Sequence, residues 1–347
     1  MRTALSIAML LTVTTIVPAA PLPEAPSLGE KYLLDDADFI AVVGLKQVLA
    51  SPLYKKNYDK LIGDLLKTEP AAALLKEAGL DPLKDIDRVV MMVGHSCYET
   101  EGMAFQNGPV FLVQGRFDPT KMMAAADKMA KDVPRVEVIA RGDAKILHIG
   151  PMNTYAAVLD KGHLFLATNK ALVEAALDKA AGKKKTALKN KEFITLFGKM
   201  KFKQSIEAIA TANMVASVSY SVDPSGKAEY KKHLLGETGV QSFVVGIAVK
   251  DELRVRVTLA VKDEETARTL ATKMEEGIKE ATRFIAREAP KFAEALGAAK
   301  FTTKDKEITI EGQGGADVVT EMFKGMFGVR VDVVPNTEFK PLGKKRT

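Results

Sequence analysis

Short apolar segments that recur in pairs across tight polar turns constrain the fold of this chain most strongly. Val136–Ala140 is followed by Lys145–Ile149, and Phe243–Val249 by Leu253–Val261. Paired segments of this length, separated by a few turn-forming residues, are typical of β-hairpins. The sequence therefore predicts sheets built mainly from antiparallel strand pairs.

Helical patterns alternate with these hairpins. One begins at Asp118-Pro119, and a longer one begins at Asp263. Aspartate accepts hydrogen bonds from the free N–H groups of a helix start, and proline fits the first turn. In the longer helix one face is apolar: Ala267, Leu270, Ala271, Met274, Ile278, Ala281 and Ile285. Because each helix would bury one face only, the pattern predicts an α+β fold of antiparallel sheet with helices packed on one face.

The second half of the chain repeats much of the first. Asp118 aligns with Asp263 at an offset of 145 residues, and Ala37–Val43 aligns with Ala212–Val218 at an offset of 175. Few identities support the alignment, so a true internal duplication and a chance resemblance of two β-α-β-β units both stay open. We expect two related units with these boundaries: a first α+β unit at 31–182, a lysine-rich linker at 183–191, a second α+β unit at 192–335 and a basic tail at 336–347.

Residues 1–19 have the three parts of a secretory signal peptide. Arg2 supplies the positive start, Ala4–Val17 is uncharged and mostly apolar, and Val17-Pro18-Ala19 is a small-residue exit. The apolar run is shorter than the roughly 20 residues that cross a bilayer. Residues 20–30 then form a proline-containing tether. The sequence predicts export, to the periplasm or the extracellular space.

Composition excludes several kinds of site. The 347 residues contain a single cysteine, which rules out an intrachain disulfide framework and any zinc or iron–sulfur site built on a cysteine cluster. The formal charge of +6 is mild, and no dense basic patch with interleaved aromatic residues accompanies it. We therefore expect no specific binding of nucleic acid.

Three segments resemble a family of exported bacterial proteins that has no assigned activity. They are Gly79-Leu80-Asp81-Pro82-Leu83-Lys84-Asp85-Ile86-Asp87, Gly115-Arg116-Phe117-Asp118-Pro119 and Asp178-Lys179-Ala180-Ala181-Gly182-Lys183. The resemblance covers most of residues 30–200 and more loosely the rest. It implies an exported protein of two α+β units, and it brings no catalytic residue to this sequence.

The motifs that carry enzyme chemistry are weak in this chain. No nucleophile elbow and no Walker lysine motif occurs, and the turn Glu311-Gly312-Gln313-Gly314-Gly315-Ala316-Asp317 has an acidic residue where a dinucleotide fingerprint needs glycine. The sequence therefore predicts no catalytic residue and no cofactor. It favours a protein that is not an enzyme.

One cluster has the chemistry of a soft-metal site. His95, Cys97 and Met103 follow Met91-Met92, and imidazole, thiolate and thioether together suit Cu(I). On a strand, His95 and Cys97 would face the same side, and the same pair could also supply a thiolate nucleophile. The alternative is that Cys97 is a small buried hydrophobe. No ligand-spacing rule decides between these interpretations.

A run of lysines lies at the expected boundary between the units. Two interpretations are open: a solvated linker, or a contact with an anionic surface such as lipid headgroups. The lysines are Lys183, Lys184, Lys185, Lys189 and Lys191.

These observations favour an exported, non-enzymatic binding or structural protein of unknown ligand. A cleft between two units is a common place for a ligand, and the partner could equally be an envelope protein or an anionic surface. Two alternatives remain. One is a carrier of an apolar ligand such as lipid, and the other is a hydrolase whose catalytic residues are dispersed in the sequence.

Overall fold

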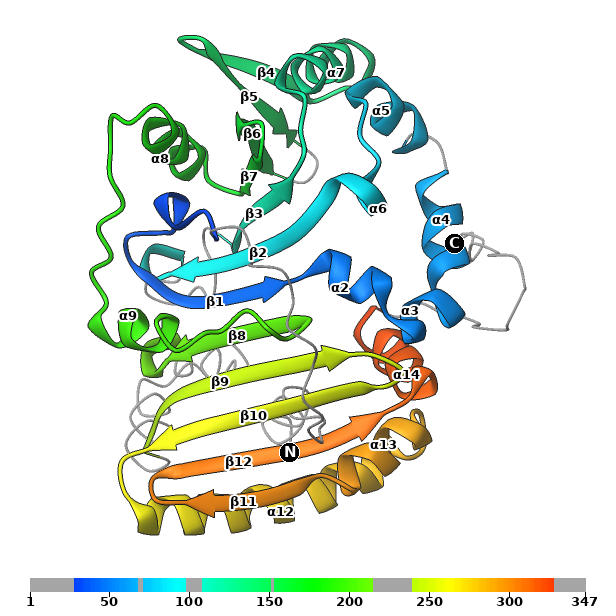
Figure 1. Cartoon of the computed structure of the whole chain (residues 1–347), viewed down its shortest axis with the longest axis vertical. Coiled ribbons are helices and arrows are strands. Elements are labelled where there is room, and N and C mark those ends of the chain that lie inside the picture. The colour runs from blue at the N-terminus through cyan, green and yellow to red at the C-terminus, as the bar shows by residue number, and fades with distance from the viewer. Residues whose placement is uncertain (1–27, 68–70, 98–107, 151–152, 215–238, 328–347) are drawn as a thin grey trace, which may run out of the picture.

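The structure is a computed structural model that describes residues 28–67, 71–97, 108–150, 153–214 and 239–327 (Figure 1). Several expectations fall outside these residues: the signal peptide at 1–19, most of the tether, Met103 and the tail at 336–347. No helix in the described ranges is long and apolar enough to span a bilayer.

All twelve strands of the described residues belong to one sheet, and every neighbouring pair is antiparallel. The strand order is β11-β12-β10-β9-β8-β1-β2-β3-β7-β6-β5-β4. The strands are β1 (Ala37–Val43), β2 (Ile86–Gly94), β3 (Val110–Gly115), β4 (Val136–Arg141), β5 (Ala144–Ile149), β6 (Thr154–Asp160), β7 (His163–Ala167), β8 (Ile206–Thr211), β9 (Val240–Val249), β10 (Leu253–Val261), β11 (Lys300–Lys304) and β12 (Glu307–Gly314). The predicted α+β class with antiparallel pairing is confirmed, as are the hairpins β4–β5 and β9–β10.

Helices connect the strands and form the outer layers. They are the short 3-10 helices η1 (Glu30–Tyr32) and η2 (His95–Cys97), and α2 (Leu45–Ala50), α3 (Pro52–Asn57), α4 (Asp59–Leu66), α5 (Ala71–Ala78), α6 (Pro82–Asp85), α7 (Pro119–Asp132), α8 (Lys170–Ala180), α9 (Lys191–Phe197), α12 (Glu264–Ile285), α13 (Pro290–Gly297) and α14 (Ala316–Phe327). Asp118 and Asp263 are the N-caps of α7 and α12, as the sequence predicts.

The two halves of the chain meet in the middle of the sheet, where β1 pairs with β8. Ile40 lies opposite Ile209 in this pair, and both side chains are fully buried. The expected units are therefore not two separate sheets. The alignment of Ala37–Val43 with Ala212–Val218 fails at its start, because residues 212–214 are helical, whereas residues 215–218 lie outside the described part of the chain. The strand of the second half that pairs with β1 is β8.

Successive residues of β8 show that helices lie on both faces of the sheet. Ala208 packs into a cluster with residues of α12, whereas Ile209 packs into a cluster with Phe193 and Leu196 of α9. Since neighbouring strand residues point to opposite faces, α9 and α12 lie on opposite sides. Figure 1 shows β9, β10, β12 and β11 face on, with α12 and α13 behind them. The expectation of helices on one face therefore does not hold for the whole sheet, since α9 and α12, both in the second half, lie on opposite faces.

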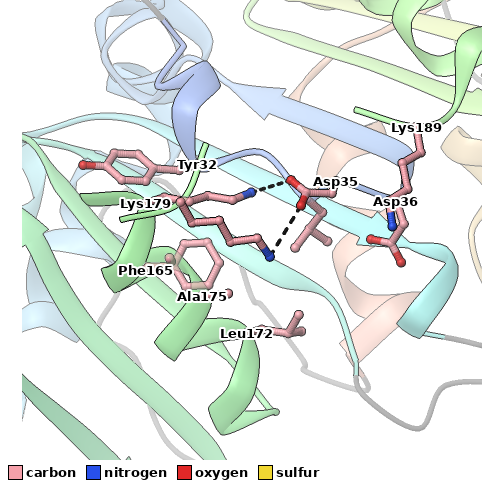
Figure 2. Close-up of a pocket in the computed structure, with 11 residues that line it drawn as sticks. Tyr32, Asp35, Asp36, Phe165, Leu172, Ala175, Lys179 and Lys189 are labelled. Carbon is pink, nitrogen blue, oxygen red and sulfur yellow. Dashed lines mark hydrogen bonds and ion pairs between the residues drawn. The ribbon is translucent and has the colours of Figure 1, made fainter. Parts of the chain in front are cut away.

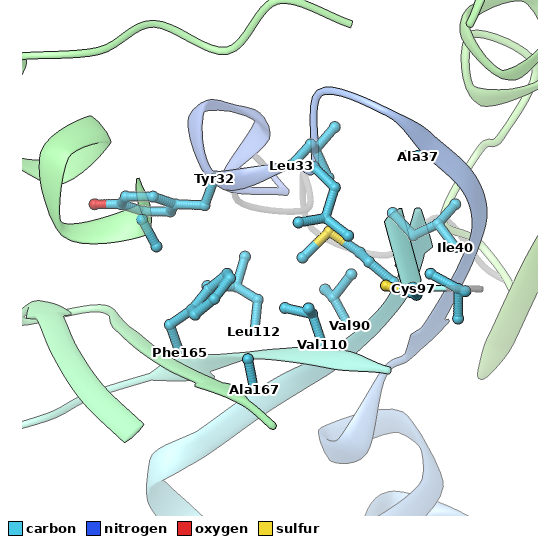
Figure 3. Close-up of a cluster of buried hydrophobic side chains, with 14 of the residues drawn as sticks. Tyr32, Leu33, Ala37, Ile40, Val90, Cys97, Val110, Leu112, Phe165 and Ala167 are labelled. Carbon is cyan, nitrogen blue, oxygen red and sulfur yellow. The ribbon is translucent and has the colours of Figure 1, made fainter. Parts of the chain in front are cut away.

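The larger buried cluster lies under η1 and α8 in the first half. Ile40, Val90 and Leu112 come from three adjacent strands and meet Tyr32 of η1 and Phe165 of β7 (Figure 3). This cluster, which we call the first core, continues across the β1–β8 pair to α9. The first half and the start of the second half therefore share it. The opposite face of β9, β10 and β12 carries the second core, against α12.

Candidate functional site

A groove lies on the sheet face that α12 leaves open, beside α9. It encloses about 420 Å³ and is lined by β8, β9 and β10 together with the segment that follows α9. In the register of these strands, Glu207 lies opposite Gly246 and Gly246 opposite Arg256. We call this hollow the sheet groove.

The floor of the sheet groove is apolar. Ile209 and Val244 face each other across β8 and β9 at one end, and Gly246 leaves the middle without a side chain. A Cβ built at Gly246 would meet only the Gln204 side chain, at 3.4 Å. The apolar lining residues are Leu196, Met200, Ile209, Val244, Val245 and Ala248.

The rim of the sheet groove is strongly cationic. Glu207 is the one acidic side chain among the lining residues. The cationic side chains are Lys199, Lys201, Lys203, Lys250, Arg254 and Arg256. An apolar floor with a cationic rim complements a molecule that has an anionic head and an apolar tail.

The six cations differ in their partners. Arg254 Nε donates to Glu252 Oε1 at 2.7 Å, and Arg256 Nε donates to Glu311 Oε1 at 2.7 Å. By contrast, the four lysines have no ion-pair partner among the residues that the structure describes. Their ammonium groups remain available to a bound anion.

Glu207 holds the segment between α9 and β8 through its main chain. Its carboxylate accepts the N–H groups of Lys203 at 2.5 Å, Gln204 at 2.9 Å and Lys201 at 3.2 Å. Phe202, between two of these donors, has a left-handed φ of 51°. Converging main-chain N–H groups around such a residue form an anion-binding concavity, or nest. We call these three donors the 201–204 nest.

A second, smaller hollow lies where the segment after α8 crosses η1 and β1. It encloses about 220 Å³, and Figure 2 shows Asp35 and Lys179 at its centre. Lys179 Nζ donates to Asp35 Oδ1 at 2.7 Å and to the Leu33 carbonyl at 2.7 Å. Burial opposes ionisation of Asp35, but the Lys179 hydrogen bond and the Ala187 N–H together lower its pKa below the ordinary value. Because Asp35 and Lys179 form an ion pair with each other, we interpret this hollow as a structural contact between segments and not as a ligand site.

Asp160 joins a histidine and a tyrosine, a combination that suits acid–base chemistry. Tyr32 Oη donates to Asp160 Oδ2 at 2.6 Å, and His163 Nδ1 lies 2.7 Å from Asp160 Oδ1. Burial alone would raise the pKa of Asp160, yet these bonds lower it to about 2. Burial, with the carboxylate as second cause, raises the pKa of Tyr32.

The remaining histidine nitrogen of this cluster is enclosed. His163 Nε2 lies 3.3 Å from Gln114 Nε2, and a Cβ at Gly29 would lie 3.0 Å from it. Neither Asp160 nor His163 lines either hollow. The cluster therefore gives no support to the alternative of a hydrolase with dispersed residues.

Of the predicted soft-metal residues, the structure describes His95 and Cys97, and a site that also uses Met103 stays a prediction. His95 and Cys97 lie on η2 and not on a strand, so the reason for placing them on the same side fails. Cys97 is fully buried in the core, as Figure 3 shows, and burial raises the pKa of its thiol. Among the described residues no group of three or more His, Cys, Asp and Glu side chains could hold a metal. Met103 lies outside those residues.

The lysine run at 183–191 is exposed but anchored. All five lysines are exposed, whereas the segment between them is hydrogen-bonded to the first half: the Ala187 N–H donates to Asp35 Oδ1, and the Thr186 hydroxyl donates to the Lys31 carbonyl. Hydrogen bonds to the first half therefore hold this segment in place. A contact with an anionic surface stays a prediction for the five lysines, which are Lys183, Lys184, Lys185, Lys189 and Lys191.

Sequence reasoning found only part of the sheet groove. Three rim lysines, Lys199, Lys201 and Lys203, follow the basic run at 183–191 in the sequence. The sequence pattern assigns Arg254 and Arg256 to a strand and does not predict that they line a groove. Their alternation with the buried Val255 and Val257 signals two cations on one open face. Nothing in the sequence places that face beside α9.

Comparisons with known proteins identify no family. No protein-family model matches the chain, and no curated protein matches its sequence. Among solved structures, crystal form III of TP0453 has a TM-score of 0.47 at 7% identity, covering 85% of this chain and 97% of that one. Crystal form I has a TM-score of 0.46 at 7% identity, covering 87% and 98%. A likeness of this degree supports no functional argument, and the resemblance to an exported family stays a prediction.

Proposed function

We propose that this protein is an exported, non-enzymatic binding protein whose ligand is an anionic amphiphile held in the sheet groove. The observation that carries the proposal is the pairing of an apolar floor with a cationic rim in one hollow of about 420 Å³. Hollows of this size, mostly apolar with a few convergent polar groups, are typical ligand sites. Export is supported by the signal-peptide pattern of residues 1–19.

The apolar floor would hold the chain of the ligand. Each buried methylene contributes about 0.8 kcal/mol to transfer from water. Gly246 adds no side chain of its own between Val244 and Ala248, so an acyl chain lying along β9 would contact the Gln204 side chain above the glycine and no β9 side chain at that point. The proposal keeps the predicted carrier of an apolar ligand and gives that ligand an anionic head.

The cationic rim would hold the head of the ligand. Lysines without an ion-pair partner can each form a charge-assisted hydrogen bond to a carboxylate or phosphate oxygen, and such bonds are worth about 1.5–3 kcal/mol. A nucleic acid would fit less well, because no aromatic side chain lines the groove for base stacking. An amphiphile with one anionic group therefore matches the lining best.

Titration calorimetry on the purified full chain tests the proposal. Sodium dodecanoate and undecyltrimethylammonium, each below its micelle concentration, both carry an undecyl chain and have opposite head charges. We expect saturable binding of one dodecanoate per chain and at least tenfold weaker binding of the ammonium compound. Equal affinity for the two would contradict a cationic head site, and no binding of either would refute the function.

Two variants separate the floor from the rim. Gly246→Val fills the floor and should weaken dodecanoate binding about tenfold or more, whereas Thr302→Val, on exposed β11, should leave it unchanged. Lys250→Gln removes a rim charge and should weaken dodecanoate binding severalfold, with Lys300→Gln at the sheet edge as the matched control. If the controls reduce affinity as much as the groove variants, binding occurs elsewhere on the protein.

A further inference from the structure

The sheet groove already binds one carboxylate, that of Glu207. This carboxylate is among the groove-lining groups, and it accepts all three N–H groups of the 201–204 nest. A nest is a site for an anion of any origin, because main-chain N–H groups recognise charge and oxygen geometry and not the molecule that carries them.

The groove lining carries more positive charges than the single Glu207 carboxylate can neutralise. Lys201 and Lys203 supply nest N–H groups and also carry ammonium groups without ion-pair partners among the described residues. Lys199 and Lys250 add two further cations to the same lining. A surplus of positive charge around an occupied anion position would favour a second anion, or an exchange of the first.

The segment that carries the nest has a second anchor besides the Glu207 carboxylate, which also interacts electrostatically with Arg88. The Phe202 ring packs against the first core, and the Arg88 guanidinium lies 5.8 Å from its ring centre. Phe202 also adopts a left-handed φ of 51°, which is rare for a bulky aromatic residue. The ring contacts therefore keep the segment in place when the carboxylate leaves, and the N–H groups stay directed toward the groove.

We infer that Glu207 is an internal occupant of the head-group position, and that the anionic head of the ligand binds the 201–204 nest by displacing it. The inference rests on the proposed function and narrows it: the head is a carboxylate or phosphate small enough to take the place of one glutamate carboxylate. Displacement makes and breaks no covalent bond. Glu207 moves into water, and the ligand head accepts the N–H groups of Lys201, Lys203 and Gln204.

Glu207→Gln and Glu207→Asp test the exchange against a purely structural role. The glutamine lacks the charge, and the aspartate keeps the charge but is one methylene shorter, so both hold the nest less well. We expect each variant to bind dodecanoate about tenfold more tightly than the wild-type chain does. Glu276→Gln is the matched control, because it removes an exposed carboxylate from α12, on the opposite face of the sheet. If Glu207 only supports the segment, both variants bind dodecanoate more weakly, and that result overturns the inference.

A small anion separates this inference from the proposed function. Inorganic phosphate has no chain, so its binding, followed by the amide NMR shifts of Lys201, Lys203 and Gln204, reports on the nest alone. We expect these amides to shift saturably with phosphate in Glu207→Gln, at concentrations at least tenfold lower than in the wild type. Phosphate binding without dodecanoate binding would refute the amphiphile and keep the nest. Dodecanoate binding with no gain in Glu207→Gln would keep the function and refute the exchange.

A wild-type measurement keeps the test valid if the variants fail to fold. The side-chain carboxyl carbon of Glu207 should change its NMR shift when dodecanoate is added, because it leaves three N–H donors for water. An unchanged shift at saturation would show that Glu207 remains in the nest.

Discussion

At the scale of single residues, buried polar groups tie distant parts of the chain together. Asp38 is 1% exposed and accepts hydrogen bonds from Asn190, which precedes α9, and from Thr211 Oγ1 at the end of β8. Lys179 is similarly enclosed and reaches Asp35, before β1. A buried polar group without partners is costly, so each of these bonds specifies which segments meet.

The Asp160 carboxylate should make stability depend on pH. Its pKa is about 2 in the folded protein and about 3.9 in an unfolded chain, so its contribution is present above pH 4 and is lost as the pH falls toward 2. Asp160→Asn should lower the free energy of unfolding by about 1 kcal/mol at pH 7, a value reduced for its partial exposure. The difference from wild type should shrink below pH 4, as measured by urea unfolding across that range.

The exposed carboxylate of Asp143 provides the comparison for Asp160. Asp143 lies in the exposed β4–β5 turn, and Asp143→Asn should change stability by less than about 0.5 kcal/mol. A difference between Asp160→Asn and wild type that stays constant from pH 7 to pH 2 would contradict the hydrogen-bonded role of the carboxylate.

At the scale of elements, local capping chemistry sets where helices begin. Asn169 precedes α8 and accepts the Ala171 N–H at 2.8 Å, while Gly182, with a φ of 70°, follows its end. Both signals are local, because an asparagine cap and a left-handed glycine act within a few residues of themselves. Asp317, by contrast, lies inside α14 as its second residue and accepts the N–H of the adjacent Val318 at 2.9 Å.

Removing the α8 cap should destabilise the protein measurably. Asn169→Ala leaves the first turn without this side-chain acceptor, and should lower the free energy of unfolding by about 1 kcal/mol. Asn169→Ser restores an oxygen acceptor and should recover most of the loss. Thermal unfolding of the two variants checks the expectation, and equal loss in both would show that Asn169 acts through something other than capping.

At the scale of the whole molecule, the β1–β8 pair makes one sheet of two halves. The first core continues across this pair to α9, so the halves share buried surface as well as hydrogen bonds. The strand orders β1-β2-β3-β7 and β8-β9-β10-β12 run outward from the pair, and α7 follows β3 as α12 follows β10. This similar order of elements in the two halves is compatible with an internal duplication, which stays a prediction.

The shared core predicts a single cooperative unfolding transition. Ile310 is 2% exposed in β12, and Ile310→Ala should cost about 3 kcal/mol through lost burial and the cavity left behind. Hydrogen exchange at β2 and β3 in the other half should accelerate together with exchange at β10, since the halves unfold as one unit. Acceleration confined to β9–β12 would show instead that the halves are independent.

The sequence by itself determined the elements of this protein. Hairpins, capped helices and the α+β class depend on alternation, helical spacing and caps, and each of these acts over a few neighbouring residues. That is why β4–β5, β9–β10 and the starts of α7 and α12 are all visible in the sequence.

Only the tertiary structure decided where those elements meet. The β1–β8 pair joins residues some 170 positions apart. The sheet groove is a second example, because the β8–β9 and β9–β10 pairs bring the segment after α9 beside Arg254 and Arg256. Pairing between distant strands is chosen by the total surface that the fold buries, and no local pattern in the sequence encodes that choice.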